Sequence, residues 1–164
     1  MKYTIEKMLM SDLERVRSIY LQGIQTGYAT FERQVPSVEQ WDAKYTKTCR
    51  LVARSNHQAI LGWAALSPVS SRSPYAGVAE VSIYMDNNHK GKGIGKSLLK
   101  QLIQESEENG FWTLQAGILI ENKASIALHK KYGFREVGIR EKICRKTNDE
   151  WGDLVLLERR SDKV

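Results

Sequence analysis

The residue types best suited to chemistry form a short run of glycines and lysines. The run reads Lys90-Gly91-Lys92-Gly93-Ile94-Gly95-Lys96-Ser97. Closely spaced glycines let a backbone approach a ligand, and apolar residues at helical spacing from position 94 onward predict that the run opens a helix. Amides at a helix N-terminus point at the ligand with the positive end of the dipole. The run therefore predicts an anion site, most naturally for a phosphate.

Two known phosphate-binding patterns fail at this run, and a third fits. The P-loop pattern GxxxxGK[ST] needs a glycine where the chain has Lys90. The dinucleotide pattern GxGxxG needs one where the chain has Lys96, and the acidic residue expected about 20 positions on is missing. The pattern [Arg/Gln]-x-x-Gly-x-[Gly/Ala] fits residues 90–95, with Lys90 as its only departure.

The predicted helices and strands place the glycine loop, residues 90–95, between a strand and a helix. The patterning predicts the order β-α-α-β-β-β-α-β-α-β-β, an α/β arrangement. Capping boxes at Ser11 with Glu14 and at Ser37 with Gln40 predict the first two helix starts. The strand preceding the loop is expected over residues 78–86, and Asn122 is expected to cap the last helix.

Composition narrows the class of protein. The 164 residues carry a net charge of +6, with 41% hydrophobic and 27% charged residues, as expected of one globular domain. No apolar run approaches the ~18 residues of a membrane span, and the N-terminus lacks a signal-peptide pattern, which favours a cytoplasmic location. Cys49 and Cys144 have no metal-binding spacing, so neither a disulfide nor a metal is expected, and both thiols are predicted to be buried. Scattered lysines and arginines without interleaved aromatics argue against nucleic acid as a partner.

Residues 90–95 resemble the acyl-CoA loop of the GCN5-related N-acetyltransferases. The resemblance extends over nearly the whole chain, through Ile83-Tyr84-Met85, Asn122-Lys123-Ala124-Ser125 and the run from Ala127 to Phe134. It implies a GNAT fold, with a single twisted mixed β-sheet flanked by helices, and one N-acetyltransferase domain over residues 1–164. It also implies acetyl-CoA as cosubstrate and no metal.

The same resemblance implies which residues hold the cofactor. The pyrophosphate is expected on the loop amides, and a splayed, bulged strand is expected to offer backbone groups to the pantetheine arm. Solvated surface remains an alternative for the lysines, and Asn122 could bind the arm, cap its helix, or do both. The implied cofactor-binding residues are Tyr84, Met85, Asp86, Lys92, Gly93, Ile94, Gly95, Lys96, Ser97 and Asn122.

Within the superfamily, three segments are similar to the phosphinothricin and methionine sulfoximine N-acetyltransferases: residues 79–84, 125–129 and 151–154. This similarity implies Glu80 and His129 as the catalytic pair. An α-ammonium must lose a proton before it attacks a thioester, so a partly buried Glu80 with a raised pKa could remove that proton directly or through water, with His129 as a second base or relay. A purely structural histidine is the competing interpretation. Tyr132 is either an acid for the leaving thiolate or a core residue.

An amino-acid acceptor also needs a partner for its carboxylate. Arg72 is the one cation in the loop over residues 67–77, and the similarity implies that Ser71, Arg72 and Ser73 bind the acceptor. Other implied acceptor contacts are Val81, Ser82 and Ile83, with Tyr28, Phe31 and Tyr75 as possible walls.

The expected function is acetyl-CoA-dependent acetylation of the α-amino group of a small amino acid such as phosphinothricin or methionine sulfoximine, by a homodimer. The alternatives are an acetyltransferase for a protein N-terminus or a polyamine, and a non-catalytic acetyl-CoA-binding module. A polyamine would favour an acidic acceptor loop, yet residues 67–78 contain no carboxylate. A silent module would be expected to lose Glu80 and His129.

Overall fold

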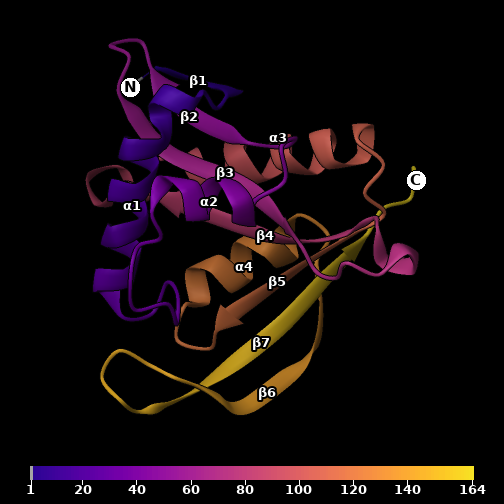
Figure 1. The fold of residues 1–164 in the computed structure, drawn as a ribbon. Coiled ribbons are helices and arrows are strands. Elements are labelled where there is room, and N and C mark those ends of the chain that lie inside the picture. Colours follow the sequence, from indigo (N-terminus) through magenta and orange to yellow (C-terminus); the bar gives the residue numbers. More distant parts are fainter. Residues whose placement is uncertain (1) are drawn as a thin grey trace.

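Residues 2–164, which the computed structural model describes, form seven strands and four α-helices in the predicted order (Figure 1). Three short 3₁₀ turns lie between them. The bounds are β1 (Tyr3–Lys7), η1 (Met10–Asp12), α1 (Leu13–Thr26), α2 (Val38–Lys44), β2 (Leu51–Ser55), β3 (Ile60–Pro68), η2 (Ser73–Tyr75), β4 (Val78–Met85), η3 (Asn87–His89), α3 (Ile94–Glu108), β5 (Thr113–Leu119), α4 (Lys123–Lys131), β6 (Arg135–Arg145) and β7 (Trp151–Arg160).

The strands form one mixed sheet in the order β1-β2-β3-β4-β5-β7-β6. Every neighbouring pair is antiparallel except β4 and β5, which run parallel. A parallel pair needs a long crossover, and α3 supplies it. The glycine loop lies where that crossover leaves the end of β4 (Figure 1).

Helices cover both faces of the sheet. On one face α1 and α2 bury Val16, Ile19 and Trp41 against Trp63 of β3. On the other face α3 buries its predicted apolar stripe, and α4 packs Ile126 and Leu128 against the same core; the stripe is Ile94, Leu98, Leu99, Leu102 and Ile103. Side chains alternate across a strand. Alternate residues of β4 therefore face the two helical layers.

Strands β4 and β5 separate soon after they meet. Their pairing covers only Val78–Glu80 against 113–115, so the later residues of both strands are unpaired along the edges that face each other. The predicted splay is thus present, but the predicted bulge is wrong. Strand β4 pairs with β3 in continuous register from Ala79 to Met85. The departure of β5 frees the edge of β4 without any inserted residue.

The first helix begins differently from its prediction, and the second begins as predicted. Asp12, not Ser11, is the residue before α1, and its carboxylate accepts a hydrogen bond from the Leu9 amide at 2.8 Å. Ser11 lies inside the 3₁₀ turn η1, which runs directly into α1, so it does not cap this helix. The Asp12 carboxylate also forms an ion pair with Arg54 of β2. At α2, Ser37 and Gln40 form the expected reciprocal capping box.

The two cysteines differ in burial, and only one of them is as buried as predicted. Cys49 is buried as predicted, but Cys144 is only half-buried, because β6 is an edge strand with most of its side chains in solvent. Both thiols are free. Among residues 2–164, no three His, Cys, Asp or Glu side chains gather as a metal site would require. In the same part of the chain, no helix has the length and apolarity of a membrane span.

Gly77 supports the one place where β4 and β5 meet. Its carbonyl accepts hydrogen bonds from Trp112 and Thr113, and an added Cβ would lie 2.1 Å from Cε3 of the Trp112 ring. We expect Gly77→Ala to lower the free energy of unfolding by about 2 kcal/mol or more, the scale of overpacking in a core. Thermal denaturation checks this, with Gly138→Ala as the control because nothing lies within 4 Å of its added Cβ. Equal melting temperatures for the two variants would contradict the predicted clash.

Candidate active site

Two cavities adjoin where β4 and β5 separate. The first, here called the loop cavity, has a volume of about 400 Å³ and extends from the glycine loop to α4. The second, the splay cavity, has a volume of about 120 Å³ and lies between the splayed strands, α4 and the segment after α1. Six residues line both cavities and mark their junction: Ala29, Ile83, Tyr84, Asn122, Ser125 and His129.

The glycine loop presents unpaired amides toward the loop cavity. Gly91 and Gly93 have φ values of +77° and +81°, which other residues rarely adopt. The first hydrogen bond of α3 runs from the Ser97 amide to the Gly93 carbonyl at 3.1 Å. The preceding amides, those of residues 94–96, have no acceptor among residues 2–164 and suit an anionic group. Lys90 and Lys96 line the same cavity and add positive charge.

The structure brings most of the predicted cofactor residues to the loop cavity. Those that line it are Tyr84, Met85, Gly93, Gly95, Lys96 and Asn122. Asn122 also caps α4, because its Oδ1 accepts a hydrogen bond from the Ser125 amide at 3.3 Å. The side-chain Nδ2 of Asn122 is left for a ligand. Ile94 is buried in the core, so it can offer only its amide.

Besides Ile94, three predicted cofactor residues do not line the loop cavity. Asp86 is buried, forms an ion pair with Arg15 and caps η3, so its carboxylate is already satisfied. The Ser97 hydroxyl is hydrogen-bonded to the Tyr3 hydroxyl at 2.8 Å, and its amide belongs to α3. Lys92 is exposed and absent from the cavity wall.

His129 lies at the junction in a defined protonation state. It is 4% exposed, and its Nδ1 is 2.7 Å from the Ser125 carbonyl, which can only accept, so Nδ1 carries the proton. Burial lowers the pKa of His129 below its ordinary value of 6.5, and the hydrogen bond to the Ser125 carbonyl only partly opposes that shift. The neutral ring therefore has a lone pair on Nε2, for which residues 2–164 provide no hydrogen-bond donor. Phe134 packs edge-on against the ring and fixes its orientation.

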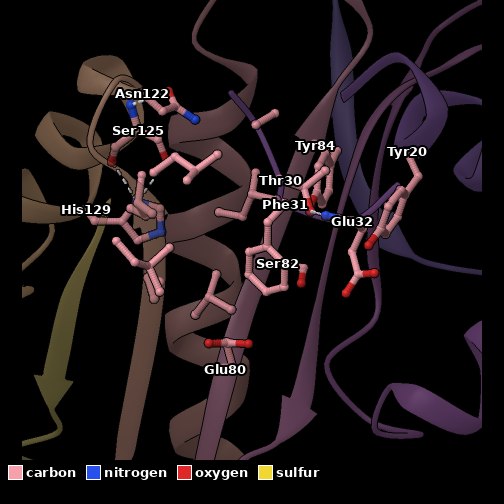
Figure 2. Close-up of a pocket in the computed structure, with 18 of the residues that line it drawn as sticks. Tyr20, Thr30, Phe31, Glu32, Glu80, Ser82, Tyr84, Asn122, Ser125 and His129 are labelled. Carbon is pink, nitrogen blue, oxygen red and sulfur yellow. Dashed lines mark hydrogen bonds between the residues drawn. The ribbon is translucent and has the colours of Figure 1, made fainter. Parts of the chain in front are cut away.

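Glu80 and Ser82 project from β4 into the splay cavity. Glu80 is half-buried, and its Oε1 accepts a 3.4 Å hydrogen bond from Gln115 of β5. Ser82 accepts a 3.3 Å hydrogen bond from the Tyr45 hydroxyl. Figure 2 shows His129 and Ser125 on one side of the cavity, with Tyr20, Tyr84 and Glu32 on the other. The predicted acceptor contacts Val81 and Ile83 also line this cavity.

The predicted acceptor loop is not brought to the cavity. Ser71, Arg72 and Ser73 are exposed, and the Arg72 guanidinium lies 5.6 Å from the centre of the Tyr75 ring. The loop leads into the start of β4, which is paired with β5, whereas the cavity lies along β4 from Glu80, the last paired residue, onward. Within one chain, the structure therefore gives no support to the predicted contact between Arg72 and the acceptor.

Tyr132 also lies away from both cavities. It is half-buried, packs against the core beside α3 and lines a surface groove with Lys100 and Arg159. This placement agrees with its interpretation as a core residue and gives no support to a role as an acid. Of the predicted walls, Phe31 lines the splay cavity and Tyr28 the loop cavity, while Tyr75 lines neither.

Several residues of the splay cavity were missed from the sequence. The segment between α1 and α2 folds over the cavity and contributes Thr30 and Glu32, while α1 contributes Tyr20 and α2 contributes Lys44. Tyr28 and Phe31, both predicted as possible walls, were the only signals in the sequence that this segment reaches the site. A single acid or lysine in a polar stretch is indistinguishable in sequence from ordinary surface charge.

Comparisons with known proteins agree with this geometry. The family model described as "Acetyltransferase (GNAT) family" matches residues 13–134. A phosphinothricin N-acetyltransferase from Alcaligenes faecalis is 30% identical over 162 residues, covering 95% of this chain and 81% of the relative. An L-methionine sulfoximine/L-methionine sulfone acetyltransferase from Pseudomonas aeruginosa is 26% identical over 163 residues, covering 96% and 94%. The crystal structure of a GNAT superfamily phosphinothricin acetyltransferase from Sinorhizobium meliloti in complex with AcCoA superposes with a TM-score of 0.87 at 30% identity, covering 98% and 89%.

Proposed function

The chain belongs to the GNAT family of acetyltransferases and is an acetyl-CoA-dependent N-acetyltransferase, and we propose that it acetylates the α-amino group of a small amino acid such as phosphinothricin or methionine sulfoximine. One observation carries this proposal. His129, neutral and with a free Nε2, lies where a cavity suited to a phosphate-bearing cofactor meets a second cavity small enough for an amino acid.

In the proposed mechanism each cavity has its own task. Acetyl-CoA supplies an acetyl thioester, and its pyrophosphate is held by the amides of residues 94–96, with Lys90 and Lys96 nearby. The pantetheine arm is bound by the free edge of β4 at Tyr84 and Met85 and by Asn122. This places the acetyl carbon at the junction of the cavities, next to His129.

Glu80 and His129 prepare the acceptor. Glu80 attracts the α-ammonium into the splay cavity, and the proton leaves through Glu80 and water or directly to Nε2 of His129. The amine then attacks the acetyl carbon with its lone pair. The amide bond forms as the carbon–sulfur bond breaks, CoA leaves as a thiolate, and the surplus proton on the nitrogen passes to that thiolate directly or through water. Unpaired β4 amides beyond Glu80 can donate hydrogen bonds to the thioester oxygen as its charge develops.

The proposal includes a homodimer in the cytoplasm, with residues 1–164 as one catalytic domain. One sheet joins strands from Tyr3 to Arg160, which supports a single domain. The edge strand β6 and the start of β7 expose apolar side chains that a second copy could cover: Val137, Ile139, Ile143 and Trp151.

Cofactor binding can be tested with two neighbouring lysines. Lys96 lines the loop cavity on the first turn of α3, whereas Lys92 does not line it. We expect Lys96→Ala to raise the KM for acetyl-CoA by about fivefold to tenfold, with a weaker dependence on salt, because a phosphate contact is lost. Lys92→Ala is the matched control and should change this KM by less than about twofold. Equal effects of both substitutions would indicate general surface attraction instead of a defined contact.

The product identifies the reaction. Incubation with methionine sulfone and acetyl-CoA labelled with ¹³C in the acetyl group should give one labelled product whose acetyl group is on the α-nitrogen, as NMR will show. Release of free acetate without an acetylated amine would contradict the proposed function.

A further inference from the structure

The splay cavity is lined by charged groups that have no ion-pair partner among residues 2–164. Glu32, Glu80 and Lys44 line it, and none of the three forms an ion pair among residues 2–164. Lys44 is also the only lysine or arginine that lines the cavity in this part of the chain. Unpaired charges around a small cavity must be balanced by water or by a bound ligand. The number and sign of the charged side chains in the cavity wall therefore determine which acceptor charges are bound favourably.

Glu32 faces the cavity from the segment that follows α1. It is half-buried, and its amide donates a 3.1 Å hydrogen bond to the Thr30 hydroxyl, which fixes the backbone at this position. Figure 2 shows its side chain next to Tyr20, on the side opposite His129. Burial raises the pKa of Tyr20 to about 12, and the negative charge of Glu32 adds to that shift. Glu32 therefore acts on the nearby Tyr20 and Tyr45 hydroxyls but forms no ion pair among residues 2–164.

Lys44 enters the cavity wall from the last turn of α2. Lys44 is exposed, and its Nζ lies 5.2 Å from the centre of the Tyr45 ring, a cation–π contact. The Tyr45 hydroxyl in turn donates a hydrogen bond to Ser82, which lines the cavity. An amino acid always brings one carboxylate. The ammonium of Lys44 is the group in the cavity wall that can pair with this carboxylate. The family similarity implied that role for Arg72.

We infer that Glu32 and Lys44 set the charge of the acceptor, so that an amino acid with an uncharged, hydrogen-bonding side chain is preferred over phosphinothricin. Lys44 binds the α-carboxylate, and Glu32 disfavours a second anion at the end of the acceptor side chain. The inference rests on the proposed function, and it assigns both residues to specificity and neither to the chemical step.

A count of charges supports this preference. Phosphinothricin brings a carboxylate and a phosphinate, but the cavity wall has a single cation for the two. Its phosphinate must then lie near Glu32 or Glu80, where like charges repel. Methionine sulfone and methionine sulfoximine end in neutral groups, which can accept hydrogen bonds from the hydroxyls around the cavity. Loss of the ammonium proton before attack makes the excess of negative charge larger in both cases.

The unmodified enzyme gives the first test. Thiol release is measured with methionine sulfone, methionine sulfoximine and phosphinothricin at saturating acetyl-CoA. We expect kcat/KM to be at least about tenfold higher for methionine sulfone than for phosphinothricin, a discrimination typical of one unpaired ionic group. An enzyme that acetylates phosphinothricin as well as the sulfone would overturn this inference and leave the proposed function intact. Absence of acetylation for every amino acid would overturn both.

Two variants then assign the preference to residues. Glu32→Gln should reduce the ratio of kcat/KM between methionine sulfone and phosphinothricin by about fivefold or more, while Glu39→Gln, an exposed acid on α2, leaves the ratio unchanged. Lys44→Met should raise the KM for methionine sulfone about tenfold but have little effect on the KM for its carboxamide, which has no carboxylate. Lys7→Met is its control on an exposed lysine. An unchanged ratio in Glu32→Gln, or equal effects of Lys44→Met on acid and amide, would overturn the assignment.

Discussion

Replacement of His129 by glutamine is expected to lower kcat by on the order of 100-fold or more, the usual contribution of a general base. Glutamine keeps a polar side chain at the junction but offers no basic nitrogen to the acceptor amine. The KM for acetyl-CoA should change little, because the proposed phosphate contacts lie on the glycine loop and not at His129. Steady-state thiol release separates the two parameters, and His57→Ala, in the exposed turn between β2 and β3, is the control. Wild-type turnover in a folded His129→Gln enzyme would exclude His129 as the base.

The pH dependence of kcat in the wild-type enzyme should also reveal His129 as the base. Burial lowers the pKa of His129 below 6.5, so Nε2 stays unprotonated at neutral pH, and kcat should fall only as pH drops below this value. The free energy of unfolding should also decrease as pH falls. The unfolded chain binds the proton more readily, so the stability due to the neutral ring is present above pH 6.5 and lost as pH falls through the folded pKa. Absence of this acid limb from the His129→Gln profile would assign it to His129.

Replacement of Glu80 by glutamine is expected to lower kcat/KM for the amino acid by about 100-fold. The amide keeps the shape and the hydrogen-bonding capacity toward Gln115, but it cannot attract an ammonium or accept its proton. Acetyl-CoA binding, measured by calorimetry, should be unchanged because Glu80 does not line the loop cavity. Gln115→Ala is the matched control, since it removes only the 3.4 Å hydrogen bond to Glu80. If Gln115→Ala lowers kcat/KM as much as Glu80→Gln does, then the hydrogen bond between the two residues matters and the charge of Glu80 does not.

The double variant shows whether Glu80 and His129 serve one proton route. Groups that act as a unit lose most of their effect with the first substitution. We therefore expect the Glu80→Gln, His129→Gln enzyme to be only slightly slower than the slower single variant. Losses that multiply would instead indicate two independent steps.

The sequence predicted what depends on local pattern. Apolar spacing after Gly93 predicted the buried face of α3, and the reciprocal capping of Ser37 and Gln40 predicted the start of α2. His129 and Asn122 lie as expected because both belong to one short helix whose caps are visible in sequence. Capping residues and apolar spacing determine where a helix begins and which face it buries, so both can be predicted from a short segment.

Long-range contacts account for what was missed. Ser11 does not cap the first helix because it lies inside a 3₁₀ turn that runs into α1, and the turn's last residue, Asp12, pairs with Arg54 on a distant strand. The expected bulge in β4 is absent because the separation from β5 alone frees the edge of the strand. Arg72 stays outside the cavity while Lys44 enters it, since the place where two strands part decides which loops face the site. No spacing rule within either segment contains that information.

If the acceptor is a free amino acid, four acceptors compared at equal concentration should react at clearly different rates. Rates of thiol release from acetyl-CoA are measured with methionine sulfone, its carboxamide, a dipeptide that begins with the same residue, and spermidine. Methionine sulfone should react at least about tenfold faster than each of the other three, because only it offers both an α-amine and the adjacent carboxylate. A faster reaction with the dipeptide or with spermidine would exclude a free amino acid as the preferred acceptor and indicate a protein N-terminus or a polyamine instead.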